Sequence, residues 1–328
     1  MTRTTSIVLL LMLLLGAWVL PANAEEKKAP DCNSPADTQT IKADKLNTEG
    51  MKLLNNRQFD KAIAKFKEAT KIAPDYRDAM LNHGIAMMQQ DKFKEALPLV
   101  EKAIKLDQKW PASWISKGKC LLELKKYDES LVAYNKLKEM NADTPNLYVM
   151  ITEVYSAKND NAKIEETLLE GLKKFPKNES LTFNLANHYL GISDPRAIVV
   201  LTQLELINPT IKGLSWRISM AWIILHQYEL AHQMAIKSEK LDGRSDHSKW
   251  LIAKSLKGMK KWDEAKVAYE QLLKENPESK EYRIELLEIA RATLKEKEVK
   301  SMAKKLKELH PEDGKWIERI EHISYYHK

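Results

Sequence analysis

The feature that most constrains this chain is the stretch of residues 43–74, whose pattern recurs along most of the sequence. It holds two amphipathic helical patterns, separated by a polar break at residues 55–57. Glycine and alanine stand where two helices would approach closely, phenylalanines fill the space beside them, and a proline ends the second helix. Counted from residue 43 as position 1, these residues are Gly50 (8), Phe59 (17), Ala62 (20), Phe66 (24), Ala69 (27) and Pro74 (32).

The pattern returns about every 34 residues, and such a helix hairpin must stack on its neighbours because it cannot bury its apolar stripe alone. The clearest later matches are Gly84 and Ala96 in the second unit, Gly118 and Tyr127 in the third, and Trp262, Ala265, Tyr269 and Pro277 in the seventh. We place the units at 43–76, 77–110, 111–144, 145–178, 179–211, 212–245, 246–279 and 280–311, with a capping helix over 312–328. The pattern is weak from residue 191 to residue 243, where we expect a change of pitch or a gap.

This spacing resembles that of tetratricopeptide repeats. The resemblance implies an all-α fold, a right-handed superhelical solenoid of about eight helix-turn-helix repeats whose first helices line a concave groove for peptides or partner proteins. Exported bacterial proteins of this kind commonly serve as scaffolds or adaptors in envelope, pilus or secretion-complex assembly. The lysines and asparagines with which some members grip a C-terminal carboxylate, at positions 5 and 9, are absent in this combination. Those positions hold Asn47, Met51, Leu81, Ile85, Ile115 and Lys119 in the first three units.

Position 5 of the first helix is apolar in six consecutive units. The residues are Leu81, Ile115, Val149, Phe183, Trp216 and Trp250. Together with Ile85 and Lys119 at position 9, they form our candidate groove for a protein partner, such as an amphipathic helix or an extended apolar peptide. An apolar column at helical spacing is more often core, so packing between neighbouring hairpins is the favoured interpretation, and the groove stays open as the alternative.

The N-terminus has a separate pattern. Arg3 precedes an apolar run over residues 7–20, and residues 22–24 form the small-x-small motif typical of a cleaved secretory signal peptide. We therefore expect a signal peptide over 1–24, a flexible lead-in over 25–42 and the periplasm as destination. An uncleaved segment would instead anchor the chain in the inner membrane, facing the periplasm, and only then do we expect membrane association.

Charge gives little further direction. Loss of residues 1–24 lowers the net charge from +7 to +6, because Arg3 is the one charged residue among them. The remaining lysines fit solvated helix faces, with an acidic partner or an anionic membrane surface as the alternative. We expect no nucleic acid partner, since an arginine-aromatic cluster is absent.

The sequence contains no phosphate-binding glycine loop, no nucleophile elbow and no zinc-binding histidine pair, so we predict no enzyme and no cofactor. His83 is expected to be a buried interhelical residue with satisfied hydrogen bonds. Cys32 and Cys120 would be able to form a disulfide in an oxidising compartment, although two cysteines do not establish one. The predicted function is a non-enzymatic protein-binding scaffold or adaptor. The alternative is homotypic structural assembly through stacked repeat ends, because the first hairpin lacks a sequence pattern for an N-terminal cap.

Overall fold

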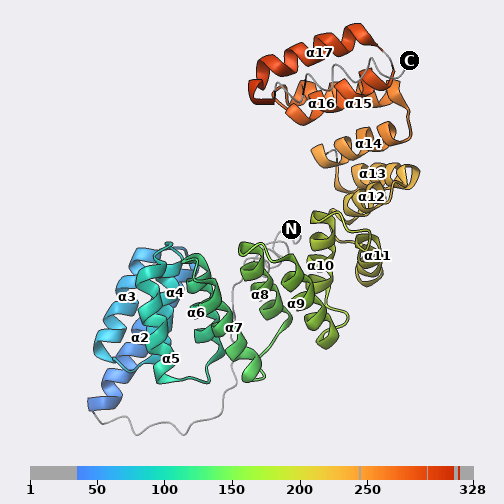
Figure 1. Ribbon diagram of the computed structural model, residues 1–328. Helices are drawn as coiled ribbons and strands as arrows, with labels where there is room; N and C mark the ends of the chain where they lie inside the picture. The colour runs from blue at the N-terminus through green and yellow to red at the C-terminus, as the bar shows by residue number, and fades with distance from the viewer. Residues whose placement is uncertain (1–34, 244, 294, 314–316, 318–328) are drawn as a thin grey trace, which may run out of the picture. The chain divides into compact units, whose positions relative to one another are not determined.

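The computed structural model describes residues 35–243, 245–293, 295–313 and 317. Within these ranges it contains sixteen α-helices, one 3-10 helix and no strand (Figure 1), which confirms the predicted all-α fold. The first helices of the hairpins are α2 (Pro35–Asn55), α4 (Arg77–Met88), α6 (Pro111–Glu123), α8 (Pro145–Ala157), α10 (Glu179–Gly191), α12 (Leu214–Ile224), α14 (Asp246–Gly258) and α16 (Lys280–Ala292). The second helices are α3 (Phe59–Ile72), α5 (Phe93–Leu106), α7 (Tyr127–Glu139), α9 (Asn161–Lys174), α11 (Ala197–Ile207), α13 (Tyr228–Asp242), α15 (Trp262–Glu275) and α17 (Glu296–Leu309).

The chain divides into two compact units, Met1–Cys120 and Leu121–Lys328, and the division lies inside α6. In the first unit, α2 to α5 pack in chain order, and the first helices α2 and α4 also touch each other. In the second unit, α7 to α17 pack in chain order, and the first helices α8, α10, α12 and α14 each touch the next. Direct contact between successive first helices places their side chains on one continuous face.

The N-terminal end of the helical array differs from the prediction. Helix α2 begins at Pro35, so residues 35–42 are helical where we expected a flexible lead-in. Ala43 and Leu46, in the middle of this helix, pack against the following helices. They are buried in an apolar cluster with Ala69 and Ala79. The predicted signal peptide lies outside the described residues.

At the other end, the described part of the predicted capping segment comprises a 3-10 helix, η1 (Pro311–Asp313), which begins one residue before that segment, and Ile317. The Ile317 side chain is buried in an apolar cluster with Leu287 of α16 and Val299 and Leu306 of α17. The last hairpin is therefore covered at this point by a residue that follows it in the chain.

The turn inside each of the first seven hairpins uses one residue in the left-handed backbone conformation, with φ between 55° and 60°. These residues are Arg57, Asp91, Lys125, Asn159, Ser193, His226 and Lys260. Successive residues of this set are one repeat length apart in the sequence. The exception is the interval from Ser193 to His226, which is one residue shorter. A single residue of this kind is tolerated although it is strained for a side chain other than glycine. The repeat is thus kept by backbone geometry even where residue types differ.

Helices approach closely at Gly50. A Cβ atom there would lie 2.6 Å from Cε1 of Phe66, whose ring is fully buried beside Ala62. Gly171 has the same role in the second unit, where a Cβ would lie 2.9 Å from Cγ of Tyr148. The absence of a side chain at these points lets an aromatic ring fill the space between two helices.

Of the two expectations for residues 191–243, the gap is wrong and the change of pitch stays a prediction. An apolar cluster runs through this region from α8 to α12, and among its buried members are Tyr148, Leu181, Leu185, Leu201, Leu204, Leu214 and Ile218. Leucine and isoleucine fill the volume that small residues and aromatic rings share in the regular units. Packing is preserved although the motif is lost.

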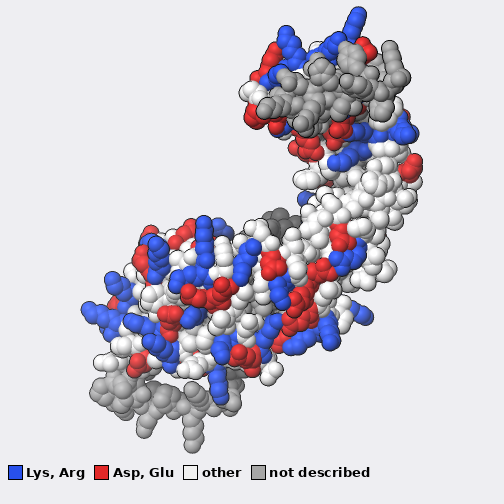
Figure 2. All heavy atoms as spheres, viewed as in Figure 1, with Lys and Arg blue, Asp and Glu red and all other residues white. Residues whose placement is uncertain are grey.

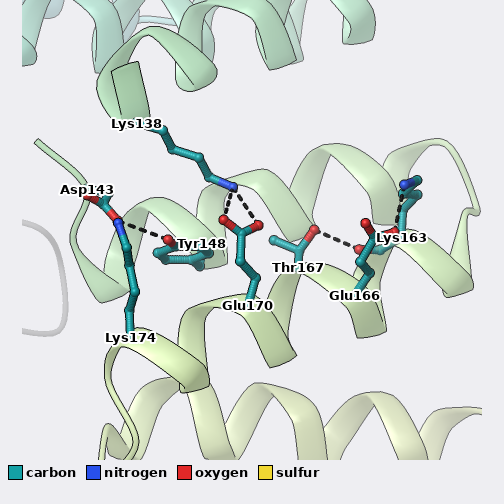
Figure 3. Close-up of polar contacts among 8 residues, drawn as sticks. All are labelled: Lys138, Asp143, Tyr148, Lys163, Glu166, Thr167, Glu170 and Lys174. Carbon is teal, nitrogen blue, oxygen red and sulfur yellow. Dashed lines mark hydrogen bonds and ion pairs between the residues drawn. The ribbon is translucent and has the colours of Figure 1, made fainter. Parts of the chain in front are cut away.

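Polar contacts also join one repeat to the next (Figure 3). Lys138 of α7 donates from Nζ to both carboxylate oxygens of Glu170 on α9, at 2.9 and 2.7 Å. Asp143 accepts from Lys174 at 2.5 Å and from the Tyr148 hydroxyl at 2.9 Å. The bond from Lys174 lowers the pKa of Asp143 below its ordinary value. Part of the lysine excess therefore serves contacts between hairpins.

Substitution Gly50→Ala should lower the free energy of unfolding by about 1–3 kcal/mol, because the buried Phe66 ring must shift to make room. Gly191→Ala is the matched control, since a Cβ there meets no atom within 4 Å. The control should change the free energy of unfolding by less than about 0.5 kcal/mol, because Gly191 is the last residue of α10. Urea unfolding followed by circular dichroism measures both, and equal behaviour of the two variants would contradict the close approach.

His83 generates a second prediction, because it is buried but not satisfied as expected. Its side chain is 6% exposed, and neither ring nitrogen has a hydrogen-bond partner among the described residues. Burial lowers the pKa of His83 below its ordinary value, and the charge of Lys67 adds to this effect. The unfolded chain therefore binds the proton at higher pH than the folded chain does.

The stability contributed by neutral His83 is present above about pH 6.5, the ordinary pKa of histidine, and is lost as the pH falls through the lowered pKa. His83→Leu should be at least as stable as the parent at pH 7.5 and should lose less stability between pH 7.5 and pH 5. Urea midpoints at a series of pH values test this. Parallel pH profiles for the two proteins would show that His83 does not carry the effect.

Candidate protein-binding face

The candidate site in the second unit lies on the first helices. We define the first-helix face as the half-buried and exposed side chains of the four successive first helices α8, α10, α12 and α14. Val149, Phe183, Trp216 and Trp250 come from these four helices in succession, and each is half-buried. The structure therefore brings these four predicted residues to one face.

Arg217 joins three of these helices in a stack. Its guanidinium carbon lies 4.5 Å from the ring centroid of Phe183 on α10 and 4.2 Å from that of Trp216 on its own helix. The Trp216 ring in turn lies 5.2 Å from the ring of His247 on α14, with an interplanar angle of 31°. We call Phe183, Arg217, Trp216 and His247 the cationic stack.

Hydrogen bonds fix the guanidinium of Arg217 in this place. Nε donates to Oδ1 of Asn187 at 2.8 Å, and Nη1 donates to the carbonyl oxygen of Gly213 at 3.0 Å. Burial lowers the pKa of Arg217 below its ordinary value. Arginine stays charged even so, because its ordinary pKa is far above neutral pH. The stack thus holds a positive charge between two aromatic rings.

Trp250 is tied to the following repeat. Its Nε1 donates to Oε1 of Glu281 on α16 at 3.0 Å, and the Nζ atom of Lys254 lies 4.5 Å from its ring centroid. One side of the ring packs against the cluster that contains Ala253 and Leu256. Trp216 and Trp250 therefore both present an aromatic ring together with a cation.

In the first unit the candidate residues have different environments. Leu81 is buried in a cluster with Val100, and Ile85 packs against the same cluster. Ile115 is half-buried and Lys119 is exposed. The column at position 5 thus ranges from core packing at Leu81 to partly exposed aromatic rings in the second unit.

Asn47, at position 5 of the first unit, is part of a polar network. Its Nδ2 donates to the Tyr76 hydroxyl at 3.3 Å, and its Oδ1 accepts from Asn82 at 2.9 Å. The Tyr76 hydroxyl donates to Asp44 at 2.6 Å. These bonds link two hairpins and occupy the side chain of Asn47.

Sequence reasoning missed the cations of the first-helix face. Lys254 had a signal, because it follows Trp250 by four residues and so shares its side of the helix. Arg217 stands one repeat length after Phe183, but adjacency across repeats is visible only once the register is known. Nothing in the sequence indicated that His247 lies on this face.

Other predicted features are placed as follows. Cys120 is fully buried beside Met88 and Ala96, and Cys32 lies outside the described residues, so the disulfide stays a prediction. Within the described ranges, no group of three His, Cys, Asp or Glu side chains is arranged to hold a metal ion. In the same ranges, no helix has both the length and the apolar character required to cross a bilayer.

These hairpins define an α-helical repeat protein, and comparison with known proteins identifies the repeat. Models of the tetratricopeptide repeat match residues 53–119, 111–144 and 248–279. The matched residues fall in the units whose motifs are most regular. The chain therefore contains tetratricopeptide repeats. No curated protein matches this sequence.

A solved structure of the same repeat type agrees with this fold. The crystal structure of a tetratricopeptide repeat protein from Parabacteroides merdae ATCC 43184 is similar with a TM-score of 0.52 at 14% identity, over 75% of this chain and 98% of that chain. The structure of Naa15/Naa10 bound to HypK-THB has a TM-score of 0.45 at 20% identity, over 82% of this chain and 42% of that chain, so this chain spans less than half of that relative. YrrB, described as having an unusual peptide-binding site, has a TM-score of 0.44 at 14% identity, over 56% of this chain and 95% of that chain.

The cationic stack generates a prediction about stability. Arg217→Ala should lower the free energy of unfolding by about 1–2 kcal/mol, because a half-buried cation loses contact with two rings. Arg217→Lys should restore only part of this loss, since an ammonium group cannot stack flat on a ring. Lys254→Ala is the control, with one ring contact and an expected loss below about 1 kcal/mol. Equal losses for Arg217→Ala and Lys254→Ala in urea unfolding would contradict a special role of the stack.

Proposed function

We propose that this protein is a non-enzymatic scaffold or adaptor that holds a segment of a partner protein on the first-helix face. Tetratricopeptide repeats support a protein-binding role in general. The observation that carries the particular proposal is the row of partly exposed aromatic rings at Phe183, Trp216 and Trp250, each fixed by contacts to the next repeat. Rigid aromatic side chains bury a large area on binding with little loss of conformational freedom.

The chemistry of this face favours a partner segment with apolar side chains. Phe183, Trp216 and Met220 of α10 and α12 are half-buried and would supply apolar contact. Arg217 and Lys254 would orient polar groups of the segment, because both lie against the same rings. We further propose export to the periplasm, supported by the signal-like pattern of residues 1–24, and a role there in assembling an envelope, pilus or secretion complex.

Site-specific photo-crosslinking in the native host tests this function. A photoreactive residue at His247, which is exposed on the first-helix face, should capture a defined partner. The matched control is Gln271, which is exposed on the second helix α15 and should capture none. Mass spectrometry identifies the captured protein.

A second arm removes the anchors. The double variant Trp216→Ala with Trp250→Ala should lose the crosslink at His247 while it keeps its helical circular-dichroism signal. Its melting temperature should fall, because Arg217 loses one ring contact and the bond from Trp250 to Glu281 is removed. Loss of the fold in this variant would instead assign the two tryptophans to packing between hairpins. Capture of a second copy of this chain at His247 would favour homotypic assembly.

A further inference from the structure

Helix α11 presents an unusual surface on the side that faces away from its neighbours. Its exposed residues are Val199, Thr202, Gln203, Leu206 and Ile207, and none is charged. Leu206 is 86% exposed and Val199 is 56% exposed. Residues 199, 203, 206 and 207 follow helical spacing, so they form one stripe.

Among the described residues, no other second helix has such a stripe. Each of α3, α5, α7, α9, α13, α15 and α17 exposes at least two charged residues. Figure 2 shows the difference, since few blue or red atoms lie around α11. A surface helix whose solvent side is uncharged and exposes Val199, Leu206 and Ile207 indicates an interaction site.

A depression lies beside the stripe. Leu172 of α9, Pro176 of the following loop and Thr182 of α10 line it on one side, and Leu206 and Ile207 line it on the other. Its volume is about 350 Å³ and it is open to solvent, so it fits side chains of a macromolecule better than an enclosed small molecule. We call the stripe and this depression the α11 patch.

The rim of the α11 patch is basic. Lys177 lines the depression and Lys173 is exposed one turn before Pro176, and neither forms an ion pair with a carboxylate among the described residues. The one acidic residue of α11, Glu205, is already bound by Lys237 at 3.1 Å. A further carboxylate lies close by, since Oε2 of Glu179 accepts from Nδ2 of Asn208, the residue after Ile207, at 2.9 Å. Lys173 and Lys177 together outweigh this carboxylate, so the patch has a net positive charge next to exposed apolar side chains.

Size and charge decide the kind of occupant. Helix α11 has 11 residues and is about 16 Å long. A partner helix of about three turns would have the same length. This length matches one short helix of a partner, whereas a stable dimer typically buries roughly 800 Å² on each partner. A symmetric dimer through this patch would also bring lysines close to lysines, which is unfavourable.

We propose that the α11 patch docks a short amphipathic helix of a partner protein, with acidic residues beside its apolar stripe. The stripe covers Leu206 and Ile207, one apolar side chain enters the depression, and the acidic residues pair with Lys173 and Lys177. This site is separate from the first-helix face, so it gives the scaffold a second binding surface.

Binding of a designed peptide to the purified full chain tests the proposal. The probe is a fluorescent 14-residue amphipathic peptide with a leucine stripe flanked by glutamates, and the comparison peptide has lysines in place of the glutamates. Fluorescence anisotropy should show at least tenfold weaker binding of the lysine peptide. Leu206→Glu should weaken the acidic peptide about tenfold or more, because it places charge in the apolar contact.

Val267→Glu is the matched control, since Val267 is 54% exposed on the second helix α15. It should leave binding unchanged. The double variant Lys173→Glu with Lys177→Glu should reverse the preference between the two peptides, and it keeps the proposal testable if Leu206→Glu disturbs folding. The variant Trp216→Ala with Trp250→Ala should still bind the acidic peptide, which separates this site from the first-helix face.

Several results would overturn the proposal. One is the absence of binding by the acidic peptide, and another is equal weakening by Leu206→Glu and Val267→Glu. A concentration-dependent dimer that Leu206→Glu dissociates would assign the patch to a second copy of this chain. Binding to anionic phospholipid vesicles that depends on Leu206, without binding of the peptide, would assign it to a membrane surface.

Discussion

The structure depends on the burial of each hairpin's apolar stripe against the next hairpin. Two short helices enclose too little volume to form a core of their own, so the contact between neighbours is the core. Close approach makes this contact dense. At Gly50 and Gly171 the missing side chain admits the ring of Phe66 or Tyr148, and the fully buried rings show that the space is filled.

The same requirement explains why one side of each helix is left accessible. Once one stripe of each helix is buried, the residues on its other side are not needed for the core. Their polarity and charge can therefore differ from repeat to repeat. The residues at position 5 of the first helices lie at the border between the two. Phe183 and Trp250 pack against apolar clusters with part of their surface, and the rest of each ring is accessible. Under the proposed function, packing and recognition would share these side chains. Phe183 is held by the cationic stack, and Trp250 by its bond to Glu281.

Residues 191–243 show that repeat geometry is more durable than repeat sequence. The motif is weak there, yet the left-handed residues Ser193 and His226 still lie in the turns after α10 and α12. Their separation is one repeat length shortened by a single position. Larger aliphatic residues such as Leu201 and Leu204 keep the volume filled. We expected a gap or a change of pitch because the motif residues were missing, but total apolar volume decides whether the hairpins stay in contact. The outer side of α11 in the same region exposes no charged residue.

The sequence alone determined the hairpin architecture, because small residues, aromatic rings and prolines at a fixed spacing admit few other ways to bury the apolar stripe. It also indicated the column at position 5, since each repeat projects the same position in the same direction. It left open which of those residues are core and which are accessible, and the tertiary structure placed Leu81 in the core and Trp216 at the surface. Only the tertiary structure revealed Arg217 between Phe183 and Trp216, the ring of His83 without a partner among the described residues, and the depression beside Leu206. The physical reason is that these features depend on contacts between residues about one repeat apart, whose orientation is set by how the hairpins pack and not by local pattern.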